Sequence, residues 1–229
     1  MLFQKFFFSV TTANSGNEAW ALLQKQKFDL VLTDVRMPNG DGLDLALKIR
    51  ARHPSVPSIL FMSGYSDLMN EEIFHIGAEG KFSKPFDNIA VRSAIETCLM
   101  LPSLRWRSEA PLKKQKIHIE CAGESIESLA LENKLLFGRG GFFVSYNKNP
   151  PEKQTIISFE IKLTKPTPIT LAGNGIVRWS HARSRTGINA GLGIELYQMP
   201  DAASNLFHRF FSELTSFIPS PYRLTEPEK

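Results

Sequence analysis

The chain has 229 residues, of which 42% are hydrophobic and 22% are charged, and its formal net charge is +4. These values are typical of a globular protein, and no apolar run approaches the ~20 residues that a membrane span needs. Residues 1–10 are apolar but short and lack a small-residue cleavage site, so the sequence predicts no signal peptide. Cys98 and Cys121 lie in apolar stretches without metal-ligand spacing, which indicates core thiols and a cytoplasmic location.

Charge and sequence texture divide the chain near residue 100. Residues 1–100 carry 10 Lys and Arg against 11 Asp and Glu, whereas residues 101–229 carry 17 against 12. An anionic partner would therefore meet the second half more naturally. Because the length fits two domains of ordinary size, we expect a first domain at 1–100, a linker at 101–115, a second domain at 116–217 and a tail at 218–229.

Strands and helices alternate in the first half. Residues 28–33 and 57–62 are short apolar runs rich in β-forming residues, as expected of strands buried on both faces. Between them, Leu43, Ala46 and Leu47 share one face of a helix. Helical spacing predicts three more helices, near Ser15 to Leu23 with a Ser15–Glu18 capping box, Met69 to Gly77 and Val91 to Leu99. This alternation predicts an α/β fold with a doubly wound parallel sheet.

Three polar residues follow the predicted strands of this sheet. Asp34 comes after residues 28–33, Ser63 after residues 57–62, and Lys84 lies just before Pro85. Because functional groups gather at the carboxyl ends of parallel strands, these three side chains are expected to converge. A carboxylate nucleophile beside a hydroxyl and an ammonium suits a phosphoryl group. Taken singly, each residue also fits a plain role as a turn former, a local cap or a Lys-Pro turn.

The segments FDLVLTDVRMPNGDGLDLALKIR, ILFMSGYSD and GAEGKFSKPF resemble the receiver domain of bacterial response regulators. The resemblance covers roughly residues 1–100 and implies a flavodoxin-like fold. It also implies that Asp34 is the phosphoacceptor, that Ser63 is the switch hydroxyl and that Lys84 is the invariant ammonium. A sensor kinase and an output protein are the partners that such a domain implies.

The sequence departs from the receiver pattern in two places. The family begins with a strand that ends in two acidic residues for Mg²⁺, whereas residues 1–20 already resemble its second strand and helix. Asp34 alone is expected to hold Mg²⁺ poorly, because this ion needs several oxygen ligands. Either a preceding segment exists, which we favour, or the domain is an interaction module that has lost its chemistry. The aromatic switch position, three residues before the lysine, is Lys81.

Short alternating runs recur in the second half. Glycine, asparagine and proline turns separate them, which predicts a small antiparallel barrel. The predicted strands lie at Lys116 to Glu120, Gly141 to Ser145, Ile156 to Ile161, Gly175 to Trp179 and Gly191 to Leu196. A closing helix after Asp201 carries an apolar stripe from Leu206 to Phe217. We interpret this stripe as core packing, with a homodimer seam as the alternative.

The segments LLFGRGGFFVS, GNGIVRW and NAGLGIEL resemble the PilZ domain, over about residues 103–217. The resemblance implies a six-stranded antiparallel barrel with a C-terminal helix and, in many members, binding of cyclic di-GMP. The ligand motifs are degraded here. Arg105 and Arg107 lie near the first motif, whereas only Gly141 survives from the second, next to Arg139. These four residues are the candidate nucleotide ligands.

Three functions remain open. The first is a receiver–PilZ regulator, controlled by phosphorylation, that acts through protein interaction. The second is a cyclic di-GMP effector that uses Arg105, Arg107 and Arg139. The third is a constitutive scaffold that binds neither ligand. No nucleophile–base pair or metal cluster indicates an enzyme, and no helix-turn-helix or zinc motif indicates direct DNA recognition.

Overall fold

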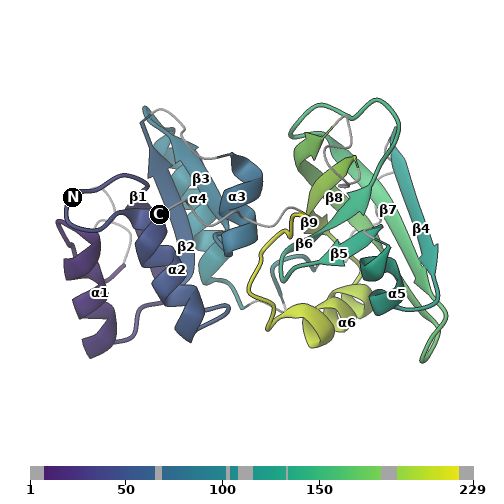
Figure 1. The fold of residues 1–229 in the computed structure, drawn as a ribbon, viewed down its shortest axis with the longest axis horizontal. Helices are drawn as coiled ribbons and strands as arrows, with labels where there is room; N and C mark the ends of the chain where they lie inside the picture. The colour runs from purple at the N-terminus through teal and green to yellow at the C-terminus, as the bar shows by residue number, and fades with distance from the viewer. Residues whose placement is uncertain are drawn as a thin grey trace.

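The computed structural model describes residues 8–64, 69–101, 104–107, 116–132, 134–181 and 190–221. Two domains lie side by side along the long axis of the molecule (Figure 1), an N-terminal α/β domain and a C-terminal β-rich domain. Among the described residues, none of the helices has both the length and the apolar character needed to cross a membrane.

The N-terminal domain is built on a three-stranded parallel sheet with the order β1-β2-β3. Its strands are β1 (Leu30–Asp34), β2 (Ser58–Ser63) and β3 (Gly80–Ser83), and its helices are α1 (Gly16–Lys25), α2 (Gly42–Arg52), α3 (Asn70–Ile76) and α4 (Asn88–Leu99). One apolar cluster joins Ile59 and Phe61 to α1, α2 and α3, and a second joins Leu60 to Val91 and Ile95 of α4. Both faces of β2 are therefore covered, which confirms the predicted parallel α/β architecture.

Local capping explains where the first helices begin. The Ser15 hydroxyl accepts the Glu18 N–H at 3.2 Å, as the capping box predicts, but Glu18 Oε2 accepts the N–H of Asn14 at 2.7 Å. Asp41 caps α2 by accepting the Asp44 N–H at 2.9 Å. These bonds satisfy backbone donors that a helix leaves without partners in its first turn.

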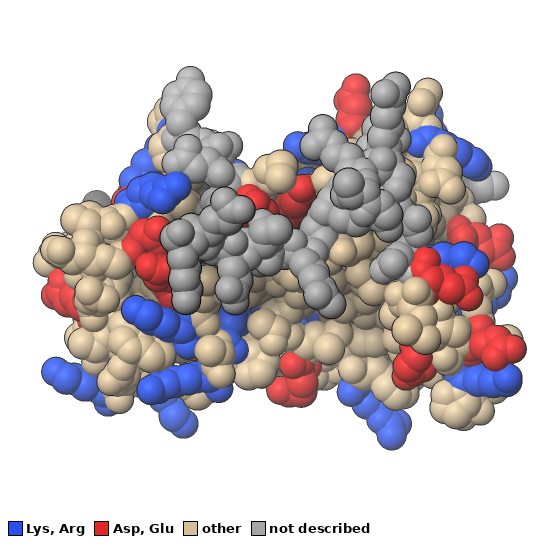
Figure 2. Space-filling view, in the orientation of Figure 1, with Lys and Arg blue, Asp and Glu red and all other residues tan. Residues whose placement is uncertain are grey.

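Basic residues lie at the opposite ends of these helices. Figure 2 shows Lys and Arg side chains along the lower edge of the N-terminal domain, where Figure 1 places the ends of α1 and α2. The last turns of these helices carry Lys25 and Arg52. Cations at a helix C-terminus interact favourably with the helix dipole, so these charges have a structural role as well as a surface one.

The C-terminal domain holds a six-stranded sheet with the order β4-β7-β8-β9-β6-β5. Its strands are β4 (His118–Gly123), β5 (Leu135–Phe137), β6 (Gly141–Ser145), β7 (Ile156–Leu163), β8 (Ile169–His181) and β9 (Gly191–Gln198), and its helices are α5 (Ile126–Leu131) and α6 (Asp201–Phe211). The six-stranded sheet and the C-terminal helix match the prediction. A wholly antiparallel barrel was the wrong expectation, because β4 pairs with β7 in parallel and the sheet is a mixed half-barrel.

The parallel pair arises from the path of the chain. After β4 the chain enters α5, which Ser125 caps by accepting the Ser128 N–H at 3.2 Å, and then forms β5 at the far edge of the sheet. The chain returns as β7 beside β4 in the same direction. The sequence pattern missed β5 and α5 because they span only three and six residues, too short to show a period.

Aromatic packing fills the half-barrel. Trp179 is buried and stacks on Phe143 with 5.7 Å between ring centroids. Gly193 makes room for this ring, since a Cβ at that position would lie 2.0 Å from Trp179. Phe207 and Phe211 of α6 are buried in the same core, which confirms core packing for this part of the apolar stripe, whereas Phe210 is exposed.

The two domains meet at an interface that we call the interdomain interface. Its N-terminal side is α3 with the turn that follows, Asn70–Glu79, and its C-terminal side includes the turn 138–141 and the segment 216–220. Phe74 and Phe217 stack with 6.2 Å between centroids. The N–H of Phe217 donates to the Phe74 carbonyl at 2.9 Å, so the C-terminal domain adds a donor to a carbonyl that also accepts the Gly77 N–H at 3.2 Å at the end of α3.

A carboxyl group at this interface carries a cost that depends on pH. Glu71 is 7% exposed and lies 3.1 Å from His181 Nε2. Burial, with repulsion from Glu72 as the second cause, raises the pKa of Glu71 to about 6 from 4.5. Because the folded protein binds this proton more tightly than the unfolded chain, ionisation of Glu71 destabilises the fold above pH 6 and has almost no effect at pH 4.

We therefore expect Glu71→Gln to raise the free energy of unfolding by about 2 kcal/mol at pH 8 and by almost nothing at pH 4. Chemical denaturation at both pH values measures this difference. Glu96→Gln is the control, because the Glu96 side chain is exposed. An equal effect of Glu71→Gln at the two pH values would contradict the assignment.

Candidate functional site

The parallel sheet places the three predicted residues at one edge. Asp34 ends β1, Ser63 ends β2 and Lys84 directly follows β3. In the strand register Asp34 pairs with Met62, and Ser63 pairs with Ser83. The Lys84 N–H donates to the Ser63 carbonyl at 2.7 Å, which fixes the lysine beside the end of β2.

Asp34 and Lys84 are in direct contact. Lys84 Nζ lies 2.7 Å from Asp34 Oδ1, and both side chains are partly exposed, 44% and 37% respectively. Ser63 is buried at 7% exposure, one residue beyond the Met62 that pairs with Asp34. The site is therefore a solvent-accessible carboxylate that is neutralised by an ammonium, with a hydroxyl on the neighbouring strand.

The loop after Asp34 holds this carboxylate in place. It turns through Asn39 and Gly40, both with positive φ, of 55° and 98°. Gly16 at the start of α1 donates to the Gly40 carbonyl at 2.9 Å, so α1 fixes the loop. Gly42 is required because a Cβ there would lie 2.0 Å from the Asp34 carbonyl oxygen.

Comparison with known proteins agrees with this geometry. The family model "Response regulator receiver domain" matches residues 1–96. Sporulation initiation phosphotransferase F of Bacillus subtilis is 30% identical over 103 residues, which cover 44% of this chain and 82% of that protein. The chain belongs to the response regulator receiver family. Its receiver domain is a module of two-component signalling, and its C-terminal half-barrel follows that module.

Other similar proteins are much longer. Response regulator protein PilR of Pseudomonas aeruginosa is 34% identical over 125 residues, 54% of this chain and 26% of PilR. DNA-binding transcriptional regulator NtrC of Salmonella typhimurium is 41% identical over 78 residues, 34% of this chain and 16% of NtrC. The chain thus spans about a quarter or less of these relatives. A solved receiver protein from Pseudomonas putida is 31% identical with a TM-score of 0.37, covering 41% of this chain and 78% of that one.

Receiver domains typically bind Mg²⁺ at the phosphoacceptor, but the described residues do not fit this ion. Within the ranges that the structure describes, no group of three His, Cys, Asp or Glu side chains could hold a metal. Of the two Asp34 carboxylate oxygens, Oδ1 is in contact with Lys84 Nζ at 2.7 Å. Mg²⁺ needs several oxygen ligands, so we derive no step that depends on it.

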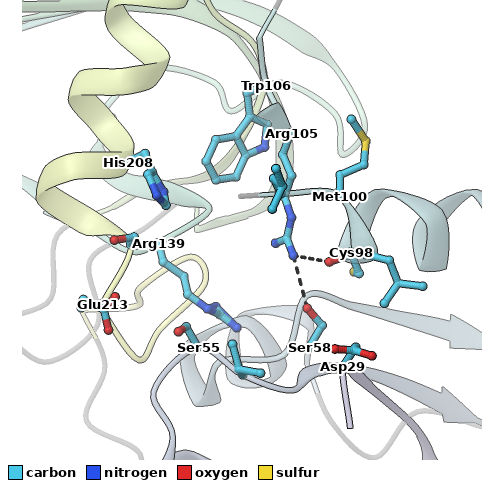
Figure 3. A pocket seen from close by; sticks show the side chains of 14 residues that line it. Asp29, Ser55, Ser58, Cys98, Met100, Arg105, Trp106, Arg139, His208 and Glu213 are labelled. Atoms are coloured by element: carbon cyan, nitrogen blue, oxygen red, sulfur yellow. Dashed lines mark hydrogen bonds between the residues drawn. The ribbon is translucent and has the colours of Figure 1, made fainter. Parts of the chain in front are cut away.

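The structure separates the candidate nucleotide ligands. Arg105 and Arg139 both line a cavity of about 610 Å³ between the domains, with Trp106 (Figure 3). Arg107 does not line it, because its guanidinium bonds to Asn205 Oδ1 at 2.5 Å on α6.

Packing and hydrogen bonds account for three of these candidates without a ligand. Arg105 donates to Ser58 Oγ at 3.3 Å and to the Cys98 carbonyl of the receiver. Arg139 is buried at the interdomain interface. Gly141 is a packing residue, since a Cβ there would lie 2.0 Å from the Ile194 carbonyl oxygen of β9.

Arg139 instead binds a receiver carboxylate that the sequence analysis missed. Its Nη2 lies 2.5 Å from Glu79 Oε1 and 2.6 Å from the Gly77 carbonyl. Glu79 also accepts the Ile59 N–H at 2.6 Å and faces Arg50 at 3.6 Å. The signal that could have indicated this role is the carboxylate in GAEGKF, between the end of the predicted helix at Gly77 and Lys84.

The switch position Lys81 lies near the C-terminal domain. Partial burial lowers the pKa of Lys81, and repulsion from Lys153, which precedes β7, lowers it further. Three charged residues lie on or next to the short strand β3: Glu79 before it, Lys81 within it and Lys84 after it.

Cys98 has no sign of reactivity. Burial raises the pKa of its thiol to about 12, so the thiol stays protonated at neutral pH.

We expect this chain, incubated with acetyl phosphate and Mg²⁺, to accumulate no phosphate on Asp34. One carboxylate in contact with an ammonium is too small a ligand set for the ion that the transfer requires. Intact-mass spectrometry measures the adduct, with Asp34→Asn as the blank. A stable adduct that is absent from Asp34→Asn would show that the coordination argument is wrong.

Proposed function

We propose that this chain is a cytoplasmic regulator of bacterial signalling in which a receiver domain controls a PilZ-like half-barrel through direct domain contact. In this proposal a sensor kinase or another protein acts on the Asp34 site. The half-barrel transmits the state of that site by binding an output protein. The protein performs no substrate chemistry of its own.

The arrangement of the second half supports the PilZ-like assignment. The segment LLFGRGGFFVS forms β5, the turn 138–140 and β6, while GNGIVRW lies on β8 and AGLGIEL, from Ala190, runs into β9. These strands are neighbours in the order β8-β9-β6-β5. Helix α6 packs against β8, as a closing helix would.

One observation carries the proposal of domain control. Strand β3 has only four residues, and it separates Lys84, in contact with Asp34, from Glu79, which Arg139 of the half-barrel binds. Strand β3 is paired along its whole length to β2, so regular backbone joins its two ends. Only this strand therefore separates the Asp34–Lys84 pair from the interdomain interface, so a change at the pair can reach the interface.

Cyclic di-GMP binding is the second candidate, because Arg105 and Arg139 share the interdomain cavity with the indole of Trp106. Arginines that face one cavity could receive phosphate groups. Two observations make this candidate weaker than the first. Arg107 bonds to α6 instead, and the Arg139 guanidinium is already bound by Glu79.

Domain control predicts that Asp34→Asn loosens the interdomain interface. Loss of the Asp34–Lys84 ion pair releases the end of β3, and an exposed pair of this kind changes an opening equilibrium by about two- to fivefold. Hydrogen exchange should therefore quicken by that factor at the amides of Phe217 and Ile218, which both donate to the Phe74 carbonyl of the receiver. Nuclear magnetic resonance of the full chain measures both amides.

Glu96→Gln is the matched control for this experiment, because it removes an exposed receiver carboxylate from the Arg92–Glu96 pair, which lies on α4. It should leave exchange at both amides unchanged. If Asp34→Asn also leaves them unchanged, the receiver does not control the contact, and a constitutive scaffold is the better description.

Calorimetric titration distinguishes the second candidate. We expect flat heats when cyclic di-GMP is added, because Arg139 is engaged by Glu79 and only part of the ligand motif survives. Saturable binding that Arg105→Ala abolishes and that Arg107→Ala, outside the cavity, leaves unchanged would establish the effector function instead.

A further inference from the structure

The receiver covers one surface of the half-barrel, which we call the Arg139 surface. It consists of the turn 138–141 and the segment 216–220. Within the half-barrel these two parts are joined by backbone bonds, from the Arg139 N–H to Ser216 and from the Gly140 N–H to Phe217, each 2.9 Å long. The turn is tight, since a Cβ at Gly140 would lie 2.0 Å from the Phe217 ring. The surface is therefore a built element of the half-barrel.

The receiver presents three kinds of group to this surface. Glu79 binds the Arg139 guanidinium at 2.5 Å. Phe74 stacks on Phe217 at 6.2 Å and joins the apolar cluster of the half-barrel, not the core of the receiver. The last carbonyls of α3 accept bonds from the segment 216–220, including a 2.7 Å bond from the Ser216 hydroxyl to the His75 carbonyl. A carboxylate, an aromatic ring and the carbonyls of a helix end thus together provide the receiver's contacts with the Arg139 surface.

The charges at this contact do not balance. Arg50 and Arg139 share the single carboxylate of Glu79, and all three side chains are 5% exposed or less. Among the described residues, Arg139 Nη1 has no hydrogen-bond partner. Burial lowers the pKa of both guanidiniums, that of Arg50 to about 10. A buried ion pair with excess charge stabilises a contact weakly, because the cost of desolvation offsets the attraction.

We infer that the Arg139 surface is a docking site for an acidic segment of a partner protein, and that the receiver segment Asn70–Glu79 occupies it as an internal competitor. The inference rests on the proposed function, since it names what the half-barrel binds once the domains separate. The contact is then autoinhibitory: the partner gains access to Arg139 and Phe217 only when the receiver withdraws.

The chemistry of the present occupant identifies the class of partner. Glu79 and Phe74 lie on one helix–turn segment, so the Arg139 surface binds a carboxylate and an aromatic ring that are held at a fixed separation. The Phe217 N–H and the Ser216 hydroxyl need backbone carbonyls such as a peptide supplies. An acidic peptide with a preceding helical turn and an aromatic residue meets all of these requirements.

The test uses the full chain and a labelled peptide of residues 70–81, NEEIFHIGAEGK, as the probe. Phe74→Asp places a charge in the aromatic stack and should separate the receiver from the Arg139 surface. The receiver core should stay intact, because Phe74 belongs to the apolar cluster of the half-barrel. The peptide should bind this variant saturably and the wild-type chain far more weakly. Fluorescence anisotropy measures the binding, and near-ultraviolet circular dichroism, to which the packed aromatic residues including Trp179 contribute, verifies the fold.

Two further changes test the role of the ion pair. Adding Arg139→Gln to the Phe74→Asp chain, or Glu79→Gln to the peptide, should weaken binding about tenfold or more, because each removes a charge-assisted hydrogen bond. Arg107→Gln is the matched control, since Arg107 bonds to α6 and should leave binding unchanged. Equal binding by wild-type and Phe74→Asp chains, or binding that ignores Arg139→Gln, would overturn the inference.

A measurement on the wild-type chain keeps the inference testable if Phe74→Asp does not fold. The amide of Phe217, which bonds to the receiver, should exchange faster than the amide of Val177, which bonds within the half-barrel at 3.0 Å. Equal protection would mean that the interface opens only on global unfolding, against the inference.

The outcomes separate this inference from the proposed function. Peptide binding with no effect of Asp34→Asn on interface exchange would retain the docking site and reject receiver control. An effect of Asp34→Asn without peptide binding would do the reverse.

Discussion

The arrangement of the two domains depends on one buried carboxylate. Glu79 has two guanidiniums as its neighbours, Arg50 from its own domain and Arg139 from the half-barrel. It also accepts the Ile59 N–H at the core of the receiver sheet. Removing this carboxylate would leave both guanidiniums uncompensated in a dry environment, and breaking a buried pair in this way typically costs about 3–5 kcal/mol. The carboxylate therefore ties the half-barrel to the central strand of the receiver.

Glu79 lies next to a strand that joins two functional regions. The four-residue strand β3 has the interdomain interface at one end and the edge that holds Asp34 and Lys84 at the other. The same strand thus contributes to the interdomain interface and to the Asp34 edge. Lys81, between its two ends, is close enough to Lys153 of the half-barrel for their charges to repel.

The sequence predicted what depends on local pattern and failed where long-range contact decides. The strand-end residues Asp34, Ser63 and Lys84 were accessible because alternating elements imply a parallel sheet, whose carboxyl ends meet at one edge. The parallel pairing of β4 with β7 was not, because pairing direction depends on where α5 takes the chain. Arg139 was noticed as a cation in a glycine-rich turn, but its partner lies 60 residues away in another domain. No local pattern in either segment records that distance.

The character of the interface distinguishes it from the cores that flank it. The half-barrel core is aromatic and apolar around Trp179 and Phe143. At the interface the apolar contribution centres on one ring pair, Phe74 and Phe217, beside an ion cluster with more positive than negative charge. Permanent interfaces resemble the first kind and exchangeable interfaces the second, because a polar surface tolerates water when it is uncovered. Apolar residues of similar volume in place of the whole Arg139–Glu79 pair would typically leave the stability unchanged or raise it, so stability alone does not require the pair. A guanidinium at this position instead suits a surface that is compatible with both water and an acidic partner.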